Sequence, residues 1–393
     1  MKKKVLMLSA AASMHDQFNR ENIKLLISMG CEVHIACNFL QGNNTSEKRV
    51  ESFKEEMELK GVICHHIDFE RNPYNLRKNR EAYIELKNLM NKVKFDLIHS
   101  HTPVVSIYAR KIAYKMSIPV IYTAHGFHFF KGAPLFYWLA FYPMEKFYSK
   151  KTDVLITINN EDYNRAKRKF NAKKIIKIPS VGLKHEYYDE SLKNTMTIRN
   201  EFGISETAIV LISVGEINKN KNHRIILQAI SRIKNYDLHY IICGKGSETE
   251  FLKELANQLH IDNRVHFAGY REDISDLLHA SDIFCFPSKR EGLGMAALEA
   301  MQSGLPLITS NVHGINDYME DGITGYKCSP KDVESFTEAI EKLASNKILR
   351  EKMGQYNKSA VSKFYCENTD LIMKDIYKQQ LGISEKEIEN AVI

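Results

Sequence analysis

Residues 282–304, DIFCFPSKREGLGMAALEAMQSG, form the clearest strand–loop–helix pattern in the chain. An apolar run ends at Pro287, a loop with Gly292 and Gly294 follows, and a helix-forming stretch ends at Gly304. Glycines let the backbone approach a ligand closely, and a helix start offers free N–H groups and a positive dipole end to a phosphate. This pattern therefore predicts a phosphate-binding loop at the end of a parallel strand.

The same alternation of strand and helix extends along all 393 residues. Apolar, β-branched runs predict thirteen strands, at 4–9, 33–37, 62–67, 96–99, 119–123, 153–157, 175–178, 208–214, 238–243, 264–267, 282–286, 305–309 and 325–327. Such alternation indicates parallel sheets with crossover helices, and thirteen strands exceed one usual open sheet. We therefore predict an α/β protein with two doubly wound, Rossmann-like domains that bind ligands at the carboxyl ends of their strands.

Pro179 and Gly182 punctuate the chain where the first seven strands end. Proline and glycine at such a point favour a domain boundary. We expect residues 1–180 to form the first domain and residues 181–393 the second. The tail is helical in pattern, with a helix expected at about 362–390. We count this helix with the second domain, with packing back on the first domain as the alternative.

The two halves of the chain differ in charge. Residues 1–180 hold 30 Lys and Arg against 17 Asp and Glu, whereas residues 181–393 hold 25 against 31. This asymmetry indicates an anionic partner for the first domain, or a basic face that is only solvated. An anionic membrane surface fits better than nucleic acid, because the basic residues are spread over several helices and no nucleic-acid module is present.

Two segments of the first domain are candidates for such a contact. Residues 127–148 combine ten aromatic side chains with flanking lysines, which is typical of a core helix or of a helix in a membrane interface. The helix expected at 77–94 adds Arg77, Lys78 and Arg80, which we expect to face the membrane.

The overall composition excludes several classes of protein. With 44% hydrophobic and 26% charged residues, the chain can bury a core and is not expected to be disordered. No apolar run approaches the roughly 20 residues that span a bilayer. The seven cysteines are odd in number and contain no C-x-x-C, which argues against disulfides and structural zinc and favours a reducing, cytoplasmic compartment.

Two pairs of residues suggest chemistry by their spacing alone. Glu291 and Glu299 are eight residues apart, about 12 Å along a helix, which could place one carboxylate at a sugar and the other at a ribose. The alternative is a glycine-rich loop followed by a helix that carries a surface glutamate. His99 and His101 form an H-x-H at a strand end, but a metal site there lacks a suitable third ligand, so we expect structural or cleft-lining roles.

The Glu-x7-Glu pattern, in residues 287–326, resembles family 4 of the retaining glycosyltransferases. The resemblance covers nearly the whole chain and implies the GT-B fold, in which two Rossmann-like domains face each other across a cleft. Residues 123–163 resemble the bacterial transferases that build capsular and exopolysaccharide repeat units.

The resemblance implies roles for individual residues of the second domain. Glu291 would contact the transferred sugar, Glu299 would hold the ribose hydroxyls, and Lys221 would grip the donor phosphates. The remaining positions that would bind substrate are Gly292, Leu293 and Gly294 as the diphosphate cradle, Gly215, Gly244 and Gly246 in the nucleotide pocket, and Tyr270 and Arg271 near the base.

In the first domain, the resemblance implies that His125 reaches towards the donor sugar and phosphate; a buried structural histidine is the alternative. The chain also departs from the family pattern. Glu216 stands where the family usually has arginine, Asp317 stands where it has glutamate, and residues 9–13 lack the usual paired glycines. A second cation for the diphosphate must therefore come from elsewhere, or it is missing.

The function implied is retaining transfer of a sugar from a nucleotide-diphosphate sugar to a polyprenyl-diphosphate-linked saccharide, at the inner face of the cell membrane. The subgroup favours a UDP-linked donor, with an N-acetylhexosamine as one candidate sugar. We expect neither cofactor nor metal, because the chain has no D-x-D and a lysine and a helix dipole would replace the metal's charge. The alternatives are a nucleotide-sugar 2-epimerase of similar fold and a non-catalytic scaffold of a polysaccharide assembly complex.

Overall fold

The structure is a computed structural model that describes residues 2–70, 75–184 and 195–391. The chain divides into two compact units, which are residues 1–182 with 366–393, and residues 183–365. Residues 366–393, which the sequence analysis counted with the second domain, thus belong to the first unit. Each unit is built around one sheet whose strands are all parallel.

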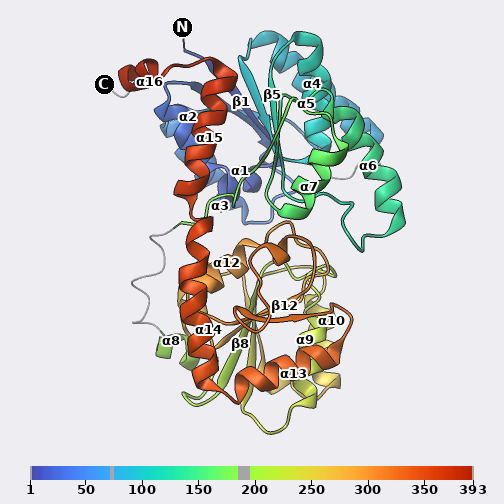
Figure 1. Cartoon of the computed structure of the whole chain (residues 1–393), viewed down its shortest axis with the longest axis vertical. Coiled ribbons are helices and arrows are strands. Elements are labelled where there is room, and N and C mark those ends of the chain that lie inside the picture. The colour runs from blue at the N-terminus through green and yellow to red at the C-terminus, as the bar shows by residue number, and fades with distance from the viewer. Residues whose placement is uncertain (1, 71–74, 185–194, 392–393) are drawn as a thin grey trace. The chain divides into compact units, whose positions relative to one another are not determined.

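The first unit has a seven-stranded sheet in the order β3-β2-β1-β4-β5-β6-β7 (Figure 1). Its strands are β1 (Lys4–Ala11), β2 (Glu32–Asn38), β3 (Ile63–His66), β4 (Leu97–Ser100), β5 (Val120–Ala124), β6 (Val154–Thr157) and β7 (Lys174–Lys177). Its helices are α1 (Ala12–Phe18), α2 (Arg20–Ser28), α3 (Glu47–Leu59), α4 (Leu76–Lys92), α5 (Pro103–Met116), α6 (Leu135–Ser149), α7 (Asn160–Lys169), α15 (Cys366–Leu381) and α16 (Glu385–Ala391).

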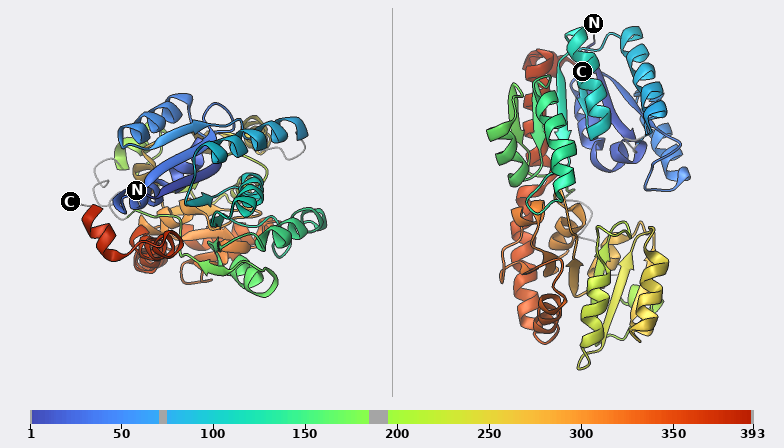
Figure 2. Two further views of the ribbon diagram at one scale, coloured as in Figure 1. Left: turned by 90° about the horizontal axis from the view of Figure 1, so that it is seen from above. Right: turned by 90° about the vertical axis from the view of Figure 1, so that its right-hand side faces the viewer.

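Helices cover both faces of this sheet (Figure 2). On one face, β1, β4 and β5 pack against α4 and α5 through side chains such as Leu6, Leu86 and Ala109, all fully buried. The C-terminal helix α15 lies beside α2. Tyr377 of α15 reaches into this unit's core, where its hydroxyl lies at hydrogen-bond distance, 2.7 Å, from Nδ1 of His99. This contact explains why the end of the chain joins the first unit.

The second unit has a six-stranded sheet in the order β10-β9-β8-β11-β12-β13. Its strands are β8 (Ile209–Val214), β9 (Leu238–Cys243), β10 (Val265–Gly269), β11 (Ile283–Phe286), β12 (Leu307–Ser310) and β13 (Gly325–Cys328). Its helices are α8 (Thr195–Glu201), α9 (Arg224–Arg232), α10 (Thr249–Gln258), α11 (Ile274–His279), α12 (Met295–Gln302), α13 (Val333–Ala344) and α14 (Lys347–Ala360). One face of the sheet packs against α9, α10 and α13.

The prediction of two doubly wound parallel sheets is confirmed. Each of the thirteen expected strands is present, with ends that agree within two residues. In both sheets the strand order reverses at the centre, between β1 and β4 in the first unit and between β8 and β11 in the second. Loops that leave neighbouring strands in opposite directions at such a switch point open a crevice, which is where doubly wound sheets bind ligands.

Candidate active site

The switch point of the second unit brings together two of the predicted loops. The loop after β8 carries Lys221, and the loop after β11 carries Glu291 and leads into α12. Strands β8 and β11 are neighbours, with Leu211 opposite Ile283. Both loops therefore leave the same edge of the sheet side by side.

Lys221 and Glu291 form an ion pair at this point. The Lys221 Nζ lies 2.7 Å from Glu291 Oε2, and each side chain is 18% exposed. The same ammonium lies 4.5 Å from the centre of the Phe286 ring, which adds a cation–π contact. An ammonium has three donors, so Lys221 can hold the carboxylate and still donate to a ligand.

The backbone before Lys221 fixes where this side chain begins. Asn218 Oδ1 accepts hydrogen bonds from the N–H groups of Asn220 and Lys221, both at 3.0 Å. Asn220 links the two loops. Its side-chain amide donates to the Arg290 carbonyl at 2.9 Å, and its backbone carbonyl accepts from the Lys289 N–H at 2.8 Å. The lysine and the glutamate are thus held by one cross-linked pair of loops.

Glycines surround the pair where the backbones come closest. A Cβ on Gly244 would lie 1.9 Å from the Gly215 carbonyl oxygen, and a Cβ on Gly246 would lie 2.1 Å from the Ile217 carbonyl oxygen. No side chain fits at either position, so the loop after β9 must have glycine there to lie against the loop after β8. The structure thus places the predicted Gly215, Gly244 and Gly246 in one layer of backbone beside Lys221.

The glycine loop after β11 sets the start of α12. Gly294 is the residue before the helix, with φ of 89°, a conformation that favours glycine. Leu293 is buried, and the Glu291 carbonyl accepts from the Gly314 N–H at 3.1 Å. A Cβ on Gly314 would lie 1.9 Å from the Gly292 carbonyl oxygen, a close approach that the sequence analysis missed.

Glu299 lies on α12 in a different electrostatic setting. Its side chain is partly exposed, yet burial of the carboxyl group raises its pKa to about 7. Burial makes this carboxyl group costly to ionise. Hydrogen bonds from hydroxyl groups stabilise the ionised form and would lower its pKa again. Glu299 is therefore suited to accept hydrogen bonds from a ligand.

The loop after β10 holds the two residues predicted near the base. Tyr270 is 42% exposed. The Arg271 guanidinium donates to Asp273 at 2.8 Å and to Glu201 at 3.0 Å, and these carboxylates raise its pKa. Because two carboxylates hold the Arg271 side chain, its backbone is better placed than its guanidinium to contact a ligand.

Two residues near the pair were missed by the sequence analysis. Burial and the neighbouring Arg224, Lys219 and Lys331 lower the pKa of Lys289, which shows that cations gather around this loop. Tyr318 is buried next to Glu291, and its hydroxyl has no hydrogen-bond partner among the described residues. Lys289 lies within the 282–304 stretch, but its residue type alone gave no role, and Tyr318 comes from a segment after β12 that no motif marks.

The switch point of the first unit holds histidines in place of an ion pair. Nε2 of His125, at the end of β5, lies 3.3 Å from Nδ1 of His101, at the end of β4. The ring of His101 also lies 4.1 Å from that of His99 and 6.2 Å from that of His15, centre to centre. Thr123 provides a further partner, since its hydroxyl lies 2.8 Å from Nε2 of His99.

His15, His99 and His101 are buried and His125 is partly buried, and loss of hydration lowers the pKa of all four. The pKa falls to about 3 for His15 and His99, to about 4 for His125, and well below the usual range for His101. All four are therefore neutral at neutral pH. Neither ring nitrogen of His15 has a hydrogen-bond partner among the described residues. His101 and His125 line a cavity of about 10 Å³, room for about one water molecule.

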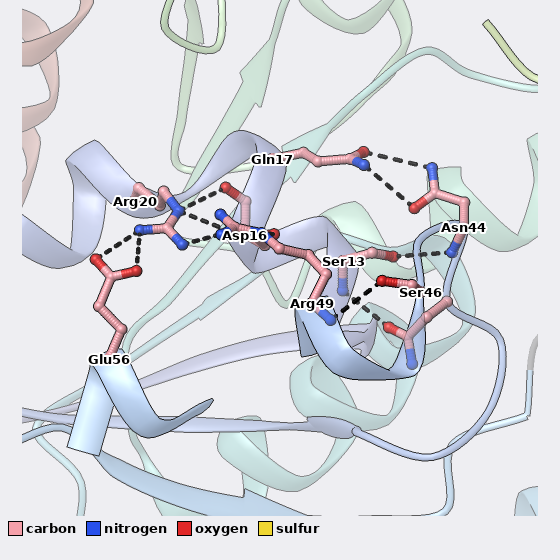
Figure 3. A network of polar contacts seen from close by, with 9 residues as sticks. Ser13, Asp16, Gln17, Arg20, Asn44, Ser46, Arg49 and Glu56 are labelled. Carbon is pink, nitrogen blue, oxygen red and sulfur yellow. Dashed lines mark hydrogen bonds and ion pairs between the residues drawn. The ribbon is translucent and has the colours of Figure 1, made fainter. Parts of the chain in front are cut away.

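The loop after β1 is shaped by a polar network, not by paired glycines (Figure 3). Asp16 of α1 accepts from Arg20 at 2.7 Å and from Arg49 of α3 at 2.9 Å. Arg20 also donates to both oxygens of Glu56, at 2.7 and 2.8 Å. This network holds α1 and α3 together, and α1, which carries His15, starts directly after β1.

The structure gives no geometric support for a metal at the H-x-H pair. In the described ranges, no three His, Cys, Asp or Glu side chains gather as metal ligands would. No helix in this described part of the chain is both long enough and apolar enough to cross a bilayer.

Two doubly wound parallel sheets in separate units are the architecture of the GT-B class of glycosyltransferases. Family models agree with this class: "Glycosyltransferase Family 4" matches residues 18–180 and "Glycosyl transferases group 1" matches residues 194–360. The chain is 32% identical to the putative glycosyltransferase EpsD of Bacillus subtilis, over 98% of this chain and 99% of that protein. The chain belongs to glycosyltransferase family 4.

A second relative and two solved structures extend the comparison. The UDP-Gal:alpha-D-GlcNAc-diphosphoundecaprenol alpha-1,3-galactosyltransferase of Escherichia coli is 28% identical over 77% of this chain and 80% of its own length. HepE of Anabaena, crystallised with UDP and glucose, matches with a TM-score of 0.76 at 16% identity, over 97% and 99% of the two chains. Sucrose-phosphate synthase of Thermosynechococcus elongatus gives 0.79 at 16% identity, over 98% and 100%. At this identity the structures support the fold alone.

Proposed function

We propose that this glycosyltransferase moves a sugar from a UDP-linked donor to a polyprenyl-diphosphate-linked saccharide during capsule or exopolysaccharide synthesis. The Lys221–Glu291 pair at the β8–β11 switch point is the observation that carries the proposal. An anionic diphosphate at the start of α12 would meet the lysine and the free N–H groups of the helix. The printed name of the E. coli relative supports a diphosphate-linked acceptor.

In the proposed reaction, the bond between the sugar's anomeric carbon and the donor diphosphate breaks, and a bond to an acceptor hydroxyl forms on the same face. The departing phosphate takes the acceptor's proton, so configuration is retained and no enzyme nucleophile is required. Lys221 stabilises the charge that develops on the leaving diphosphate. Glu291 positions the sugar, Glu299 accepts from the ribose hydroxyls, and His125 donates a hydrogen bond to the donor.

We also propose that transfer requires no metal. Lys221 and the start of α12 would supply the positive charge, and the cations around Lys289 are candidates for the one that Glu216 cannot provide. Full activity after chelation is the expected result. Loss of activity that magnesium restores would contradict this part of the proposal.

A panel of nucleotide-sugars assayed with lipid-linked saccharide acceptors, read by mass spectrometry, tests the proposed function. A product heavier than the acceptor by one sugar, formed from a UDP-linked donor, is expected. An isomer of the donor formed without acceptor would favour the epimerase. No product from any donor, with UDP-sugar bound, would favour the scaffold. An N-acetylhexosamine is the first sugar to try.

A further inference from the structure

The outward face of α6 is apolar, the reverse of the usual pattern on a surface helix. The α6 face consists of Leu135, Phe136, Leu139, Pro143 and Phe147, which repeat at helical spacing and are all exposed. Leu135 is 73% exposed, Leu139 69% and Phe136 57%. Surface helices normally turn charged and polar side chains to solvent, and contiguous apolar patches mark interaction sites.

The inward face of α6 carries the helix's only carboxylate. Glu145 is buried, and both terminal nitrogens of Arg110 lie 3.0 Å from one of its oxygens. Its other oxygen accepts from the Tyr122 hydroxyl at 3.2 Å. This buried ion pair fixes the rotation of the helix, because turning α6 around would leave Arg110 without its partner. The apolar face is therefore held outwards.

Cations border the α6 face at its C-terminal end. Lys146 lies in the last turn of the helix, and Lys150 and Lys151 follow its end; the first two are exposed and Lys151 is partly buried. The Lys151 ammonium lies 5.0 Å from the centre of the Phe147 ring. Such a mixture of exposed aromatic, aliphatic and lysine side chains is typical of helices that lie in the plane of a membrane interface.

A basic groove opens between α6 and α7 beside this face. Its volume is about 460 Å³, and it is lined by Trp138, Tyr142, Glu161, Asn164, Arg165, Arg168 and Lys169. Arg165 is held by Glu161, at 2.8 Å, and stacks 4.8 Å from the Trp138 ring. Arg168 and Lys169 are exposed at the end of α7, so the groove offers them to an anionic group.

We propose that the α6 face and the α6–α7 groove dock the protein on a bilayer of anionic phospholipids, with the apolar side chains in the interface and Arg168 and Lys169 on lipid phosphates. Charge complementarity favours lipid over a second copy of the chain, since the apolar face is bordered by cations and its only carboxylate is buried. The inference deepens the proposed function, because a lipid-linked acceptor lies at such a surface. It also moves the docking face away from Arg77, Lys78 and Arg80 of α4.

Vesicle co-sedimentation tests the apolar part of this surface. The variant Phe136→Ser/Leu139→Ser/Phe147→Ser is compared with Leu40→Ser/Leu59→Ser/Leu371→Ser, which changes three exposed leucines elsewhere in the same unit. With vesicles of phosphatidylcholine and phosphatidylglycerol, we expect the α6 variant to lose at least about tenfold in partitioning and the control to bind as the parent does. Equal binding by the α6 variant and the parent overturns the proposal.

Charge reversal tests the groove. Arg168→Glu/Lys169→Glu should lower binding to the mixed vesicles about tenfold or more at about 0.1 M salt, and should change binding little at about 1 M salt, where charges are screened. Arg77→Glu/Arg80→Glu is the matched control on α4 and should bind as the parent does. If the α4 variant loses binding and the groove variant does not, α4 is the docking face and the proposal is wrong.

Two further measurements separate docking from catalysis and from self-association. Both docking variants should keep the parent's rate on a short-chain, water-soluble acceptor, whereas failure of the proposed function would remove that rate in every protein, including the parent. Light scattering should show the same oligomeric state for parent and α6 variant. A dimer that the α6 variant abolishes, with no vesicle binding by the parent, would assign the α6 face to a second copy and overturn the proposal.

Discussion

The two sheets have the same strand order at their centres but different chemistry where that order reverses. The second unit places an ion pair, Lys221 with Glu291, among close-packed glycines. The first unit places three neutral histidines, His15, His99 and His125, around the buried His101 at the equivalent point. One topology therefore offers a charged site suited to a diphosphate and an uncharged, polar site. The fold sets where a site can lie, and the loop residues decide what it can bind.

Removing the charge from the second unit's switch point should have the largest effect. Lys221→Ala should lower kcat at least about 100-fold, about 3 kcal/mol of barrier, because the leaving diphosphate loses a charge-assisted contact. Lys234→Ala, at an exposed lysine just after α9 in the same unit, is the control and should stay near the parent rate. A Lys221→Ala rate within about threefold of the parent, at unchanged melting temperature, would remove Lys221 from the site.

The two glutamates should separate binding from chemistry. Glu299→Gln should raise KM for the donor roughly tenfold or more with little change in kcat, because contacts to the ribose hold ground state and transition state alike. Glu291→Gln should do the opposite, since it contacts the sugar that reacts. Steady-state kinetics on both variants measures this division. A collapsed kcat with normal KM for the Glu299 variant would contradict it.

Acid should weaken the first unit through its histidines. Burial lowers the pKa of His15 to about 3, so the unfolded chain binds the proton more readily and stability falls as the pH drops from about 6.5 towards 3. At pH 5 the neutral burial of His15 should lower the free energy of unfolding by at most about 2 kcal/mol, relative to its value at neutral pH. The fluorescence of Trp138, the one tryptophan of the chain, reports unfolding in urea.

His15→Leu should therefore reduce the loss of stability between pH 7 and pH 5. His66→Leu, at an exposed histidine of the same unit, should leave that loss unchanged. Identical pH dependence in the parent and both variants would show that His15 is not the buried neutral group described above.

Donor binding should depend on pH through Glu299 by a smaller amount. Its pKa of about 7 means that much of the carboxyl group is protonated at pH 6, and a donor that needs the ionised form must displace that proton. Calorimetry of UDP binding in buffers of different ionisation enthalpy should show release of part of a proton at pH 6 and almost none at pH 8. Glu299→Gln should release fewer protons than the parent at pH 6, because only the terminal phosphate of UDP then titrates near this pH, and equal release by the two proteins would contradict the account.

The strands and the loops that carry the candidate site could be predicted from the sequence, because periodicity and glycine position are local signals. Lys221 and Glu291 were predicted separately, and their pairing follows from β8 and β11 being neighbours. Long-range contacts left no such signal. The sequence does not reveal that Tyr377 reaches His99, 278 residues away, or that Tyr318 lies beside Glu291.

The aromatic segment shows the same limit of local patterns. Composition left open whether residues 127–148 belong to the core or to a membrane interface. In the structure, some of their aromatic side chains are buried and others are exposed. Phe127, Phe129 and Phe130 are buried, whereas Phe136 and Phe147 are exposed. The direction in which α6 faces depends on the Arg110–Glu145 pair, which no periodicity in α6 alone predicts.

Hydrogen exchange with and without UDP tests most directly the claim that the donor's diphosphate lies at the second unit's switch point. The account predicts that amides of residues 215–221 and 291–299 become protected when UDP binds, and that Lys221→Ala weakens this protection at the same UDP concentration. Protection confined to the histidine loops of the first unit, with no change in residues 215–221 or 291–299, would contradict it.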